Sequence, residues 1–437
     1  MPDIDLIAAQ EANHAGPSKG KPAKSAKAWN IRASPAVGRS RNPIRATLAT
    51  LTTVKPTTTK SLINLGIGDP THYPLHPPPP AATSSVRDAV ISERANGYVP
   101  GAGMVSAREA VAEYHSRWDG VKYGIDDIVL THGVGQALDL VFSILFPHQL
   151  AERSNILLPR PGFALYATLL ANLNVEVRYY DCLEEQGWEV DLDMLESLCD
   201  DDTRAIMITN PSNPCGSNFT ESHLRDILDI AEANRVPIIA DEIYGHMTWT
   251  RPFIPLAALS TSVPILTLSG LSKRFLLPGW RFGWVALHDP LGVAAPIKEG
   301  LGVWANRFFG PCSLTQASLP DILQTESQWF DDVLAKVRAN ADVIYSAINE
   351  TPGLSCSKPE GALYILVRID QTAFPQFVDE VDFCTTLLRE EAVFVMPGLC
   401  FETPGYFRVV IASPADIMHE VGERLKEFSS RHCRQLF

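Results

Sequence analysis

The stretch Leu266-Thr-Leu-Ser-Gly-Leu-Ser-Lys-Arg-Phe-Leu-Leu-Pro-Gly-Trp-Arg-Phe-Gly-Trp284 contains an apolar run that ends at Ser269-Gly270, then a lone lysine, Lys273, and Arg281 eight residues later. The apolar run is typical of a buried strand, which the glycine ends. A lysine amine beside cationic groups or in a dry pocket can form a Schiff base with an aldehyde. The stretch therefore predicts a covalent anchor for an aldehyde cofactor. The alternative is a surface lysine in a basic turn, because short serine-lysine patterns recur by chance.

Pyridoxal phosphate is the aldehyde that proteins most often hold on a lysine. Its phosphate requires hydroxyls, backbone amides and a bidentate arginine. Within this stretch the candidates are Ser269, Ser272 and Arg281. Other parts of the chain must then supply the remaining groups that such a cofactor needs.

The composition is that of an ordinary globular protein large enough for two domains. The 437 residues are 46% hydrophobic, which allows one large core or two. Lys and Arg number 37 against 50 Asp and Glu, a formal net charge of −13. Binding to nucleic acid or to anionic membranes requires basic surfaces. We therefore expect small-molecule substrates and no nucleic-acid partner.

The eight cysteines are scattered, without a Cys-x-x-Cys pair or a Cys/His cluster at metal-ligand spacing. We therefore expect reduced thiols and no metal. No apolar run approaches the ~20 residues that span a bilayer. The N-terminus also lacks the basic-then-apolar layout of a signal peptide. These features favour a cytoplasmic protein without a membrane partner.

Composition and periodicity divide the chain into four parts. Residues 1–28 are rich in Ala, Lys, Gly, Pro and Ser, and predict a disordered tail. Residues 29–70 form an N-terminal segment that we expect to join a small domain. Residues 71–325 alternate short apolar strands with helical stretches and predict a large cofactor-binding domain. Residues 326–437 predict a smaller α+β domain.

The fold class expected is α/β: a large, doubly wound, mostly parallel seven-stranded sheet domain with the smaller α+β domain beside it. The seven candidate strands are Ile128–Thr131, Asn155–Leu158, Val175–Tyr179, Ala205–Thr209, Pro237–Ala240, Ile265–Leu268 and Gly283–Leu287. Helical spacing covers residues 135–145 and 221–232. A sheet of this kind binds ligands at the carboxyl ends of its strands.

In the smaller domain, the pattern predicts a long helix through Ile348 and strands at 362–368, 393–397 and 406–411. The last helix carries four apolar residues on one face, and they are Ile417, Val421, Leu425 and Phe428.

Two of the predicted strands end in residues suited to a phosphorylated ring. Gly133-Val134-Gly135 links a strand to a helix, and free amides at a helix N-terminus bind phosphate. An ordinary glycine turn is the alternative. Phe163 follows the next strand, where a flat aromatic side chain could stack on a pyridine ring. A core phenylalanine is the alternative there.

Further strand ends carry polar residues. In Asn210-Pro-Ser-Asn-Pro-Cys-Gly216 two prolines force an extended turn, so Asn213 could donate its amide to a ring oxygen. Asp241 ends a buried strand, where a lone carboxylate needs a partner such as a protonated pyridine nitrogen. Tyr244 could reach the ring hydroxyl. Arg408 lies in an apolar strand and could bind a substrate carboxylate. A helix N-cap for Asp241 and a structural ion pair for Arg408 are the alternatives.

From about Trp29 to Arg431 the chain resembles the fold-type I pyridoxal-phosphate aminotransferases. The resemblance rests on ordered motifs, which are Asn-Pro-Ile-Arg-Ala, Ile-Gly-Asp-Pro, Pro-Arg-Pro-Gly-Phe, Asn-Pro-Ser-Asn-Pro-Cys-Gly, Ala-Asp-Glu-Ile-Tyr-Gly and Pro-Gly-Trp-Arg-x-Gly-Trp. It implies an aspartate aminotransferase-like fold. It also implies a pyridoxal 5′-phosphate enzyme that transfers amino groups between amino acids and 2-oxo acids.

The resemblance implies that Lys273 forms the Schiff base and then acts as the acid and base of the proton shift. Asp241 would pair with the pyridine nitrogen, while Asn213 and Tyr244 would bind the ring oxygen. Phe163 would stack on the ring, and Arg281 would hold the phosphate together with the Gly133-Val134-Gly135 turn.

For the substrate, the resemblance implies that Arg408, Asn213 and the amide of Gly68 bind the α-carboxylate. Tyr98 would reach the phosphate of a neighbouring subunit, so the active site would be shared in a homodimer. Many aminotransferases have a serine where this chain has Gly270, and either Ser269 or Ser272 is expected to replace its contact.

No arginine matches the family's distal-carboxylate arginine, since the spacing from Arg307 to Gly310-Pro311 differs. This departure argues against a dedicated dicarboxylate preference. The resemblance implies transamination of aromatic L-amino acids, chiefly L-tyrosine, with 2-oxoglutarate by a ping-pong mechanism.

Other reactions and roles are open at this point. A cysteine-conjugate β-lyase or a broad-specificity alanine/kynurenine aminotransferase would use the same ring, lysine and aspartate. A non-catalytic regulator built on this fold would need a DNA-binding domain, which the acidic charge and short tail do not provide.

Overall fold

The computed structural model describes residues 31–146 and 153–434. The predicted disordered tail, residues 1–28, lies outside these ranges. The chain divides into two units, Met1–Pro35 and Ala36–Phe437, and the second contains all the elements considered below. No boundary near residues 70 or 325 is drawn within that unit, so the predicted division into large and small domains stays a prediction.

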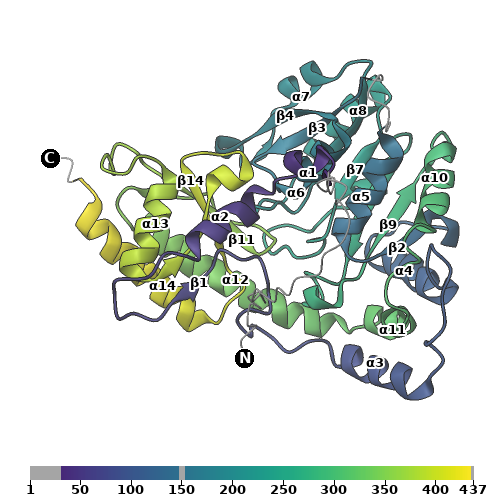
Figure 1. The fold of residues 1–437 in the computed structure, drawn as a ribbon, viewed down its shortest axis with the longest axis horizontal. Coiled ribbons are helices and arrows are strands. Elements are labelled where there is room, and N and C mark those ends of the chain that lie inside the picture. Colours follow the sequence, from purple (N-terminus) through teal and green to yellow (C-terminus); the bar gives the residue numbers. More distant parts are fainter. Residues whose placement is uncertain (1–30, 147–152, 435–437) are drawn as a thin grey trace, which may run out of the picture. The chain divides into compact units, whose positions relative to one another are not determined.

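The large sheet has eight strands in the order β2-β9-β8-β7-β6-β3-β4-β5 (Figure 1). Their bounds are β2 Ile128–Thr131, β3 Asn155–Arg160, β4 Glu176–Leu183, β5 Glu189–Val190, β6 Thr203–Thr209, β7 Ile238–Asp241, β8 Ile265–Gly270 and β9 Gly283–His288. All seven predicted strands are present. The additional strand, β5, has two residues, too few for an apolar pattern to reveal it.

Five consecutive strands of this sheet, β8, β7, β6, β3 and β4, run parallel. Strand β9 is antiparallel to both of its neighbours, and β5 is antiparallel to β4. The central strands are apolar along their length because helices cover both faces of a parallel sheet. The carboxyl ends of the five parallel strands consequently meet at one edge.

Alternate residues of the strands enter two different helical layers. Met207 packs with α5 (Val134–Leu145), α6 (Leu165–Leu173) and α10 (Ala295–Ala305). Its neighbours Ile206 and Ile208 pack instead with α7 (Leu192–Leu198), α8 (Glu221–Asn234) and α9 (Leu256–Leu259). This two-residue period is what a strand between two helical layers requires.

The end of the sheet formed by β2 and β9 is covered separately. Helices α4 (Val105–Trp118) and α11 (Ser313–Leu323) pack there, and α3 (Pro80–Ser92) contacts α11. Short turns complete the region around the sheet, and they are η1 Ile125–Asp127, η2 Glu184–Gln186 and η3 Pro278–Trp280.

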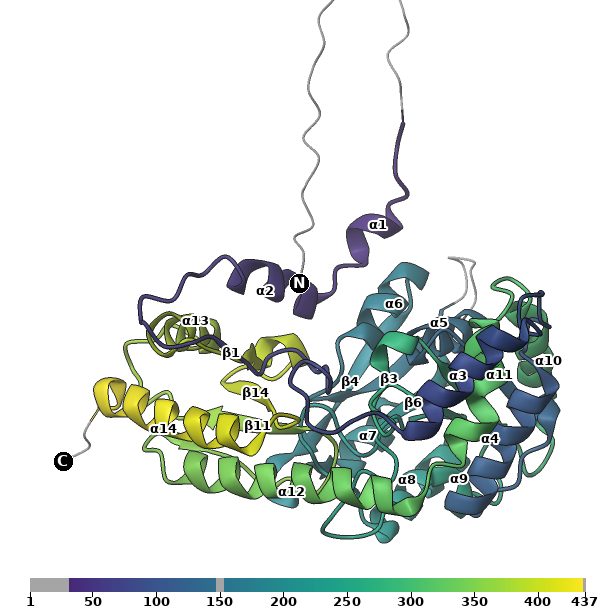
Figure 2. The same ribbon diagram turned by 90° about the horizontal axis from the view of Figure 1, so that it is seen from below.

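After α11 the chain forms α12 (Ser327–Asn349) and a four-stranded antiparallel sheet in the order β10-β11-β14-β13. Its strands are β10 Leu354–Ser355, β11 Tyr364–Ile369, β13 Met396–Pro397 and β14 Tyr406–Val410, and its other helices are α13 Glu380–Glu391 and α14 Ala415–His432. Helices α12 and α14 lie side by side (Figure 2). Three of the four predicted apolar residues of α14 are fully buried, and Ile417 is partly buried.

The predicted strand at 393–397 is divided in two. Val393–Phe394 is β12, which pairs in parallel with β1 (Ile63–Asn64), whereas β13 pairs with β14. The N-terminal segment also carries α1 (Ala36–Arg39) and α2 (Pro43–Leu51). Helix α2 packs against the turn η4 (Gly398–Phe401).

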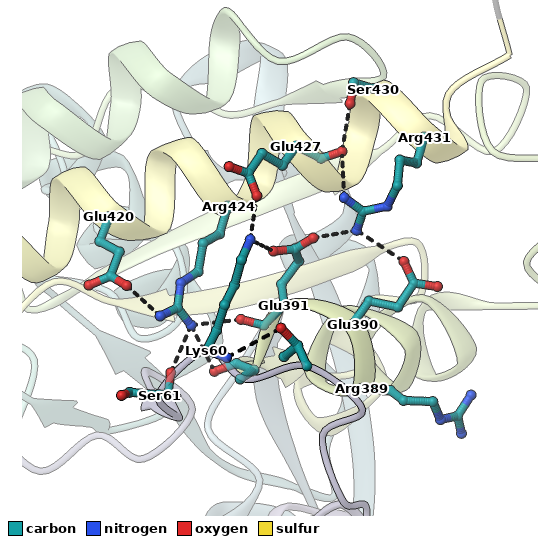
Figure 3. A network of polar contacts seen from close by, with 12 residues as sticks. Lys60, Ser61, Arg389, Glu390, Glu391, Glu420, Arg424, Glu427, Ser430 and Arg431 are labelled. Carbon is teal, nitrogen blue, oxygen red and sulfur yellow. Dashed lines mark hydrogen bonds and ion pairs between the residues drawn. The ribbon is translucent and has the colours of Figure 1, made fainter.

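A polar network fixes the chain just before β1 (Figure 3). The Arg424 guanidinium donates to the carbonyls of Ser61 and Glu391, at 2.8 Å and 2.6 Å. Lys60 pairs with the buried Glu391 carboxylate at 2.5 Å and also with Glu427. These contacts hold residues 60–64 against α13 and α14, so the following loop, residues 65–69, enters the centre of the molecule in a defined position.

Within residues 31–146 and 153–434, no helix is long and apolar enough to cross a membrane. All eight cysteines are free thiols.

Candidate active site

A cavity of about 450 Å³ lies at the carboxyl ends of the parallel strands. Eleven predicted site residues line it, and they are Gly68, Val134, Gly135, Phe163, Asn213, Asp241, Tyr244, Ser272, Lys273, Arg281 and Arg408. Three others, Gly133, Ser269 and Tyr98, do not line it. The edge of the sheet thus brings together residues that are far apart in the sequence.

Lys273 follows the end of β8, and its amine donates a hydrogen bond to the carbonyl of Gly68. The next residue, Arg274, is buried. Its guanidinium lies 4.0 Å from the Trp118 ring centre and 4.3 Å from that of Phe330. Because Arg274 is held in this aromatic surround, the loop presents Lys273 to the cavity.

Asp241 is the last residue of β7 and is only 4% exposed. Its Oδ2 accepts a 2.6 Å hydrogen bond from the Tyr166 phenol, and its Oδ1 accepts one from the Ile243 amide at 3.2 Å. Burial raises the pKa of Asp241 to about 6, although both hydrogen bonds and the charge of Lys273 oppose this shift. No ion pair to Asp241 is formed by the described parts of the chain. A buried carboxylate of this kind is suited to a cationic ring nitrogen.

The phenol of Tyr244 shares a 2.6 Å hydrogen bond with that of Tyr364, a residue of β11. Burial, followed by the neighbouring Tyr364 oxygen, raises the pKa of Tyr244 well above its ordinary value. Burial also acts to raise the pKa of Tyr364, but the charges of Lys273 and Arg408 more than compensate and lower it. Tyr244 therefore keeps its proton, and it lines the cavity.

Arg408 in β14 is 3% exposed and lies at the other end of this group. Its guanidinium donates to Asn213 Oδ1 at 2.9 Å and to the Gly66 carbonyl at 2.8 Å, while its Nε has no hydrogen-bond partner. Burial lowers the pKa of Arg408. No carboxylate of residues 31–146 or 153–434 pairs with it. A buried guanidinium with only neutral partners is suited to an anionic ligand.

The residues predicted to bind a phosphate lie where β2 turns into α5. Gly133 caps this helix with φ +77°, and a Cβ added there would lie 2.6 Å from the Arg281 guanidinium. Val134 and Gly135 open the helix, where backbone amides lack intrahelical partners. A glycine is therefore required for Arg281 and the helix N-terminus to come together. Gly133 contributes through its backbone conformation and does not line the cavity itself.

The two candidate serines point to different sides of the sheet. Ser272 lines the cavity with Lys273, whereas Ser269 lines a second, smaller cavity with Thr267. Alternation along β8 places Thr267 and Ser269 on the same face. Of the two alternatives for phosphate binding, the geometry favours Ser272.

The departure at Gly270 has a steric reason. A Cβ at this position would lie 2.5 Å from the Phe282 carbonyl oxygen and 2.8 Å from the Gly283 Cα. The backbone of Phe282 and Gly283 therefore leaves no room for a serine there.

Sequence reasoning missed three residues that shape the site. Tyr166 holds Asp241, Tyr364 pairs with Tyr244, and the Gly66 carbonyl orients Arg408. Tyr166 lies in the first turn of α6, where no local pattern distinguishes it from a core residue. Tyr364 lies in an apolar strand, where no local pattern distinguishes it from a core residue.

Tyr98 lies outside the cavity. Its side chain is 99% exposed, and its ring lies 6.2 Å from that of Phe309, which is also exposed. Its predicted contact with a neighbouring subunit stays a prediction.

The donor set fits pyridoxal phosphate. Lys273 supplies the amine, Asp241 supplies an unpaired buried carboxylate for a ring nitrogen, and Tyr244 supplies a protonated phenol for a ring oxygen. Arg281 and the first residues of α5, Val134 and Gly135, supply a cation and backbone amides for a phosphate. Among residues 31–146 and 153–434, no group of three His, Cys, Asp or Glu side chains could hold a metal ion.

The family model "Aminotransferase class I and II" matches residues 60–425. The tyrosine aminotransferase of Mus musculus is 42% identical over 421 residues, which cover 95% of this chain and 90% of that protein. The tyrosine aminotransferase of Homo sapiens is 40% identical over 434 residues, which cover 98% and 93%. The solved structure of tyrosine aminotransferase from Leishmania infantum superposes with a TM-score of 0.88 at 31% identity, covering 93% of this chain and all of that one. The chain therefore belongs to the class I and II aminotransferases, a family of pyridoxal 5′-phosphate enzymes.

Proposed function

We propose that this enzyme transfers the amino group of aromatic L-amino acids, chiefly L-tyrosine, to 2-oxoglutarate, and so forms 4-hydroxyphenylpyruvate and L-glutamate by a ping-pong mechanism. The observation that carries the proposal is the arrangement of one cavity. Lys273 and the buried, carboxylate-free Arg408 line it together with an apolar wall from the N-terminal segment. The extensive similarity to tyrosine aminotransferases supports the choice of donor.

Substrate binding depends on Arg408. The α-carboxylate common to amino acids and 2-oxo acids is the anion that its guanidinium can bind in a bidentate manner. The guanidinium donates hydrogen bonds to Asn213 and to the Gly66 carbonyl, which fix its position. Gly68 lines the same cavity. A carboxylate held here orients the α-carbon of the substrate in the cavity that Lys273 also lines.

Bound pyridoxal phosphate supplies an electron-withdrawing ring that stabilises negative charge at the substrate α-carbon. Asp241 would pair with the ring nitrogen, and this ion pair would offset the cost of burying the carboxylate. Lys273 would hold the cofactor, and its Nζ, once free, would act as the base for the substrate α-proton. Tyr244 would donate to the ring oxygen, and Arg281, Ser272 and the start of α5 would hold the phosphate.

The side chain of the donor faces an apolar wall. Ile44, Leu48 and Ile67 line the cavity and pack against the cluster that contains Leu51 and Phe394. An aromatic ring in contact with these aliphatic side chains is removed from water, which favours binding at roughly 25 cal/mol per Å² of apolar surface.

We also propose that the enzyme is a cytoplasmic homodimer. The exposed aromatic side chains of Tyr98 and Phe309 support an association surface. The eight free cysteines support a reducing compartment.

Half-reaction spectra test the proposed donor. The purified enzyme is mixed with tyrosine, phenylalanine, aspartate, alanine or kynurenine, and the loss of the visible cofactor band is recorded. Tyrosine and phenylalanine should react fastest. Rapid conversion by alanine or aspartate and none by tyrosine would overturn the assignment. Release of pyruvate from cysteine conjugates without a 2-oxo acid would indicate a β-lyase instead.

A further inference from the structure

Tyr364 in β11 lies among the residues assigned to the cofactor and to the substrate. It lines the cavity and is only 1% exposed. Its phenol oxygen lies 2.6 Å from that of Tyr244, and its ring centre lies 4.4 Å from Cζ of Arg408. One side chain thus contacts both the residue expected to bind the ring oxygen and the residue expected to bind the substrate carboxylate.

The pairing of β11 with β14 brings Tyr364 and Arg408 together. Arg408 lies directly opposite Leu366, and Tyr364 is two positions from Leu366, on the same face of the sheet. Diagonal neighbours of this kind are within reach of each other when one is aromatic and the other is long. The contact is therefore set by the register of two strands.

The hydroxyl of Tyr364 lies against the loop at residues 65–69. A Cβ added to Gly68 would be 2.5 Å from this hydroxyl oxygen. The carbonyl of the same glycine accepts the hydrogen bond from the Lys273 amine. A side chain at Gly68 would therefore displace either the loop that holds Lys273 or the phenol that meets Tyr244.

The number of available protons decides the direction of the hydrogen bond between the two phenols. A phenol has one proton to donate, and its oxygen can also accept. If Tyr244 donates to the ring oxygen, the proton between the two phenols must come from Tyr364. Burial acts to raise the pKa of Tyr364, but the charges of Lys273 and Arg408 more than compensate and lower it, which favours Tyr364 as the donor.

We propose that Tyr364 is a positioning residue for the reaction, with its hydroxyl donating to the Tyr244 oxygen and its ring supporting the Arg408 guanidinium. The inference rests on the proposed function. A phenol that accepts a hydrogen bond becomes a stronger donor, because hydrogen bonds in a chain polarise one another. The hydroxyl therefore strengthens the contact of Tyr244 with the ring oxygen, while the ring holds Arg408 through a cation–π contact.

The hydroxyl is tested by a pH titration of the visible cofactor band, without substrate, in the holoenzyme and in Tyr364→Phe. The band changes with pH because the nitrogen that joins Lys273 to the cofactor gains or loses a proton. A donor to the ring oxygen reduces the negative charge beside this nitrogen and so favours loss of the proton. The midpoint of Tyr364→Phe should therefore move to higher pH, by roughly 0.4 to 1 pH unit.

A double-mutant cycle with Tyr244→Phe separates this role from a general change in the cavity. Tyr244→Phe should also raise the midpoint, since the donor to the ring oxygen is lost. Adding Tyr364→Phe to that variant should produce no further shift, because Tyr364 acts through Tyr244. Equal shifts in both backgrounds, or an unchanged midpoint in Tyr364→Phe, would overturn the proposal.

The ring is tested by the kinetics of single half-reactions. Tyr364→Phe retains the ring beside Arg408, so kcat should fall while KM stays within about twofold of the wild-type value. Tyr364→Leu also removes the ring, so KM should rise roughly 2- to 30-fold for amino acids and 2-oxo acids alike. If Tyr364→Leu does not fold, Tyr364→Met gives the same comparison. Equal KM values for the variants with and without the ring would contradict its role.

Tyr180→Phe is the matched control. Tyr180 is also buried, and its phenol donates to the Met207 carbonyl away from the cavity lining. The midpoint and KM should match those of the wild type. If the midpoint rises as far as in Tyr364→Phe, loss of any buried phenol explains the shift and the proposal is wrong. A failure of the proposed donor is distinguishable, because the titration uses no substrate and reports on Tyr364 whichever amino acid reacts.

Discussion

The phenol of Tyr166 donates a 2.6 Å hydrogen bond to Oδ2 of Asp241, and both side chains are buried. Burial raises the pKa of Asp241 to about 6, and this hydrogen bond counteracts the shift. Tyr166 is thus a positioning residue that keeps the Asp241 carboxylate ionised in a setting that disfavours charge.

Tyr166→Phe should therefore raise the pKa of Asp241 further. A larger fraction of the carboxyl group would be protonated near neutral pH, so it would pair less well with the ring nitrogen. The acid limb of the pH profile of kcat/KM should move to higher pH, and cofactor affinity should fall. The measurements are the pH profile and a cofactor titration that follows the visible absorbance.

The control for this variant is Tyr180→Phe. Tyr180 is also buried and donates a 2.6 Å hydrogen bond to the Met207 carbonyl, but it does not line the cavity. It should lose about 1 kcal/mol of stability and leave the pH profile in place. Equal pH profiles for the two variants would contradict the role of Tyr166.

The raised pKa of Asp241 also predicts how the stability of the cofactor-free enzyme depends on pH. Its pKa is about 6 in the folded protein and about 4 in an unfolded chain, so the folded state binds the proton more tightly. The contribution of Asp241 to stability is therefore greatest below pH ~4 and is lost as the pH rises through ~6, in total by about 3 kcal/mol.

Asp241→Asn removes the titrating group, so the unfolding free energy of its cofactor-free form should lack this decline. The variant should be more stable than the wild type above pH ~6 and similar below pH ~4. Urea unfolding of both cofactor-free proteins across this range measures the difference. If the unfolding free energies of the wild type and of Asp241→Asn change with pH in the same way, ionisation of Asp241 does not destabilise the folded protein, and the prediction is wrong.

Lys273→Ala should abolish the covalent attachment of the cofactor. The visible absorbance band and transamination should both disappear, because no other lysine lines the cavity among the described residues. Borohydride reduction followed by peptide mass spectrometry should locate the cofactor on Lys273 in the wild type. Lys298→Ala removes a surface lysine paired with Asp127 and should retain both band and activity.

Arg408→Lys should weaken every substrate by a similar factor. Tyrosine, glutamate and 2-oxoglutarate share the α-carboxylate, and lysine cannot replace the bidentate guanidinium or both of its hydrogen bonds, to Asn213 and Gly66. KM should rise roughly 10- to 100-fold for each substrate. Steady-state kinetics with both donors test this expectation. A selective loss of glutamate would instead assign Arg408 to the distal carboxylate.

Tyr98→Ala tests the shared active site of the proposed homodimer. If Tyr98 acts in the neighbouring subunit, this variant and Lys273→Ala should each be impaired alone and should complement each other in mixed dimers. A mixed dimer would contain one site with both residues intact, so activity should return after subunit exchange. No recovery in dimers of verified mixed composition would place Tyr98 outside the neighbouring site.

The sequence by itself determined the architecture and much of the site. Strands and helices were predictable because burial between two helical layers requires continuous apolar strands that alternate with amphipathic helices. The residues at the carboxyl ends of these strands were predictable for the same reason, since parallel strands bring their ends to one edge. Lys273, Asp241 and Tyr244 all follow from this rule.

Only the tertiary structure decided which partners these residues have. Tyr364 meets Tyr244 from 120 positions away, Asn213 meets Arg408 across 195, and Gly68 meets Lys273 across 205. Contacts over such separations leave no local periodicity, because they depend on how different elements pack together. The choice of Ser272 over Ser269 depends on the same packing. Local patterns thus specified the groups, and the packing of distant elements set their geometry.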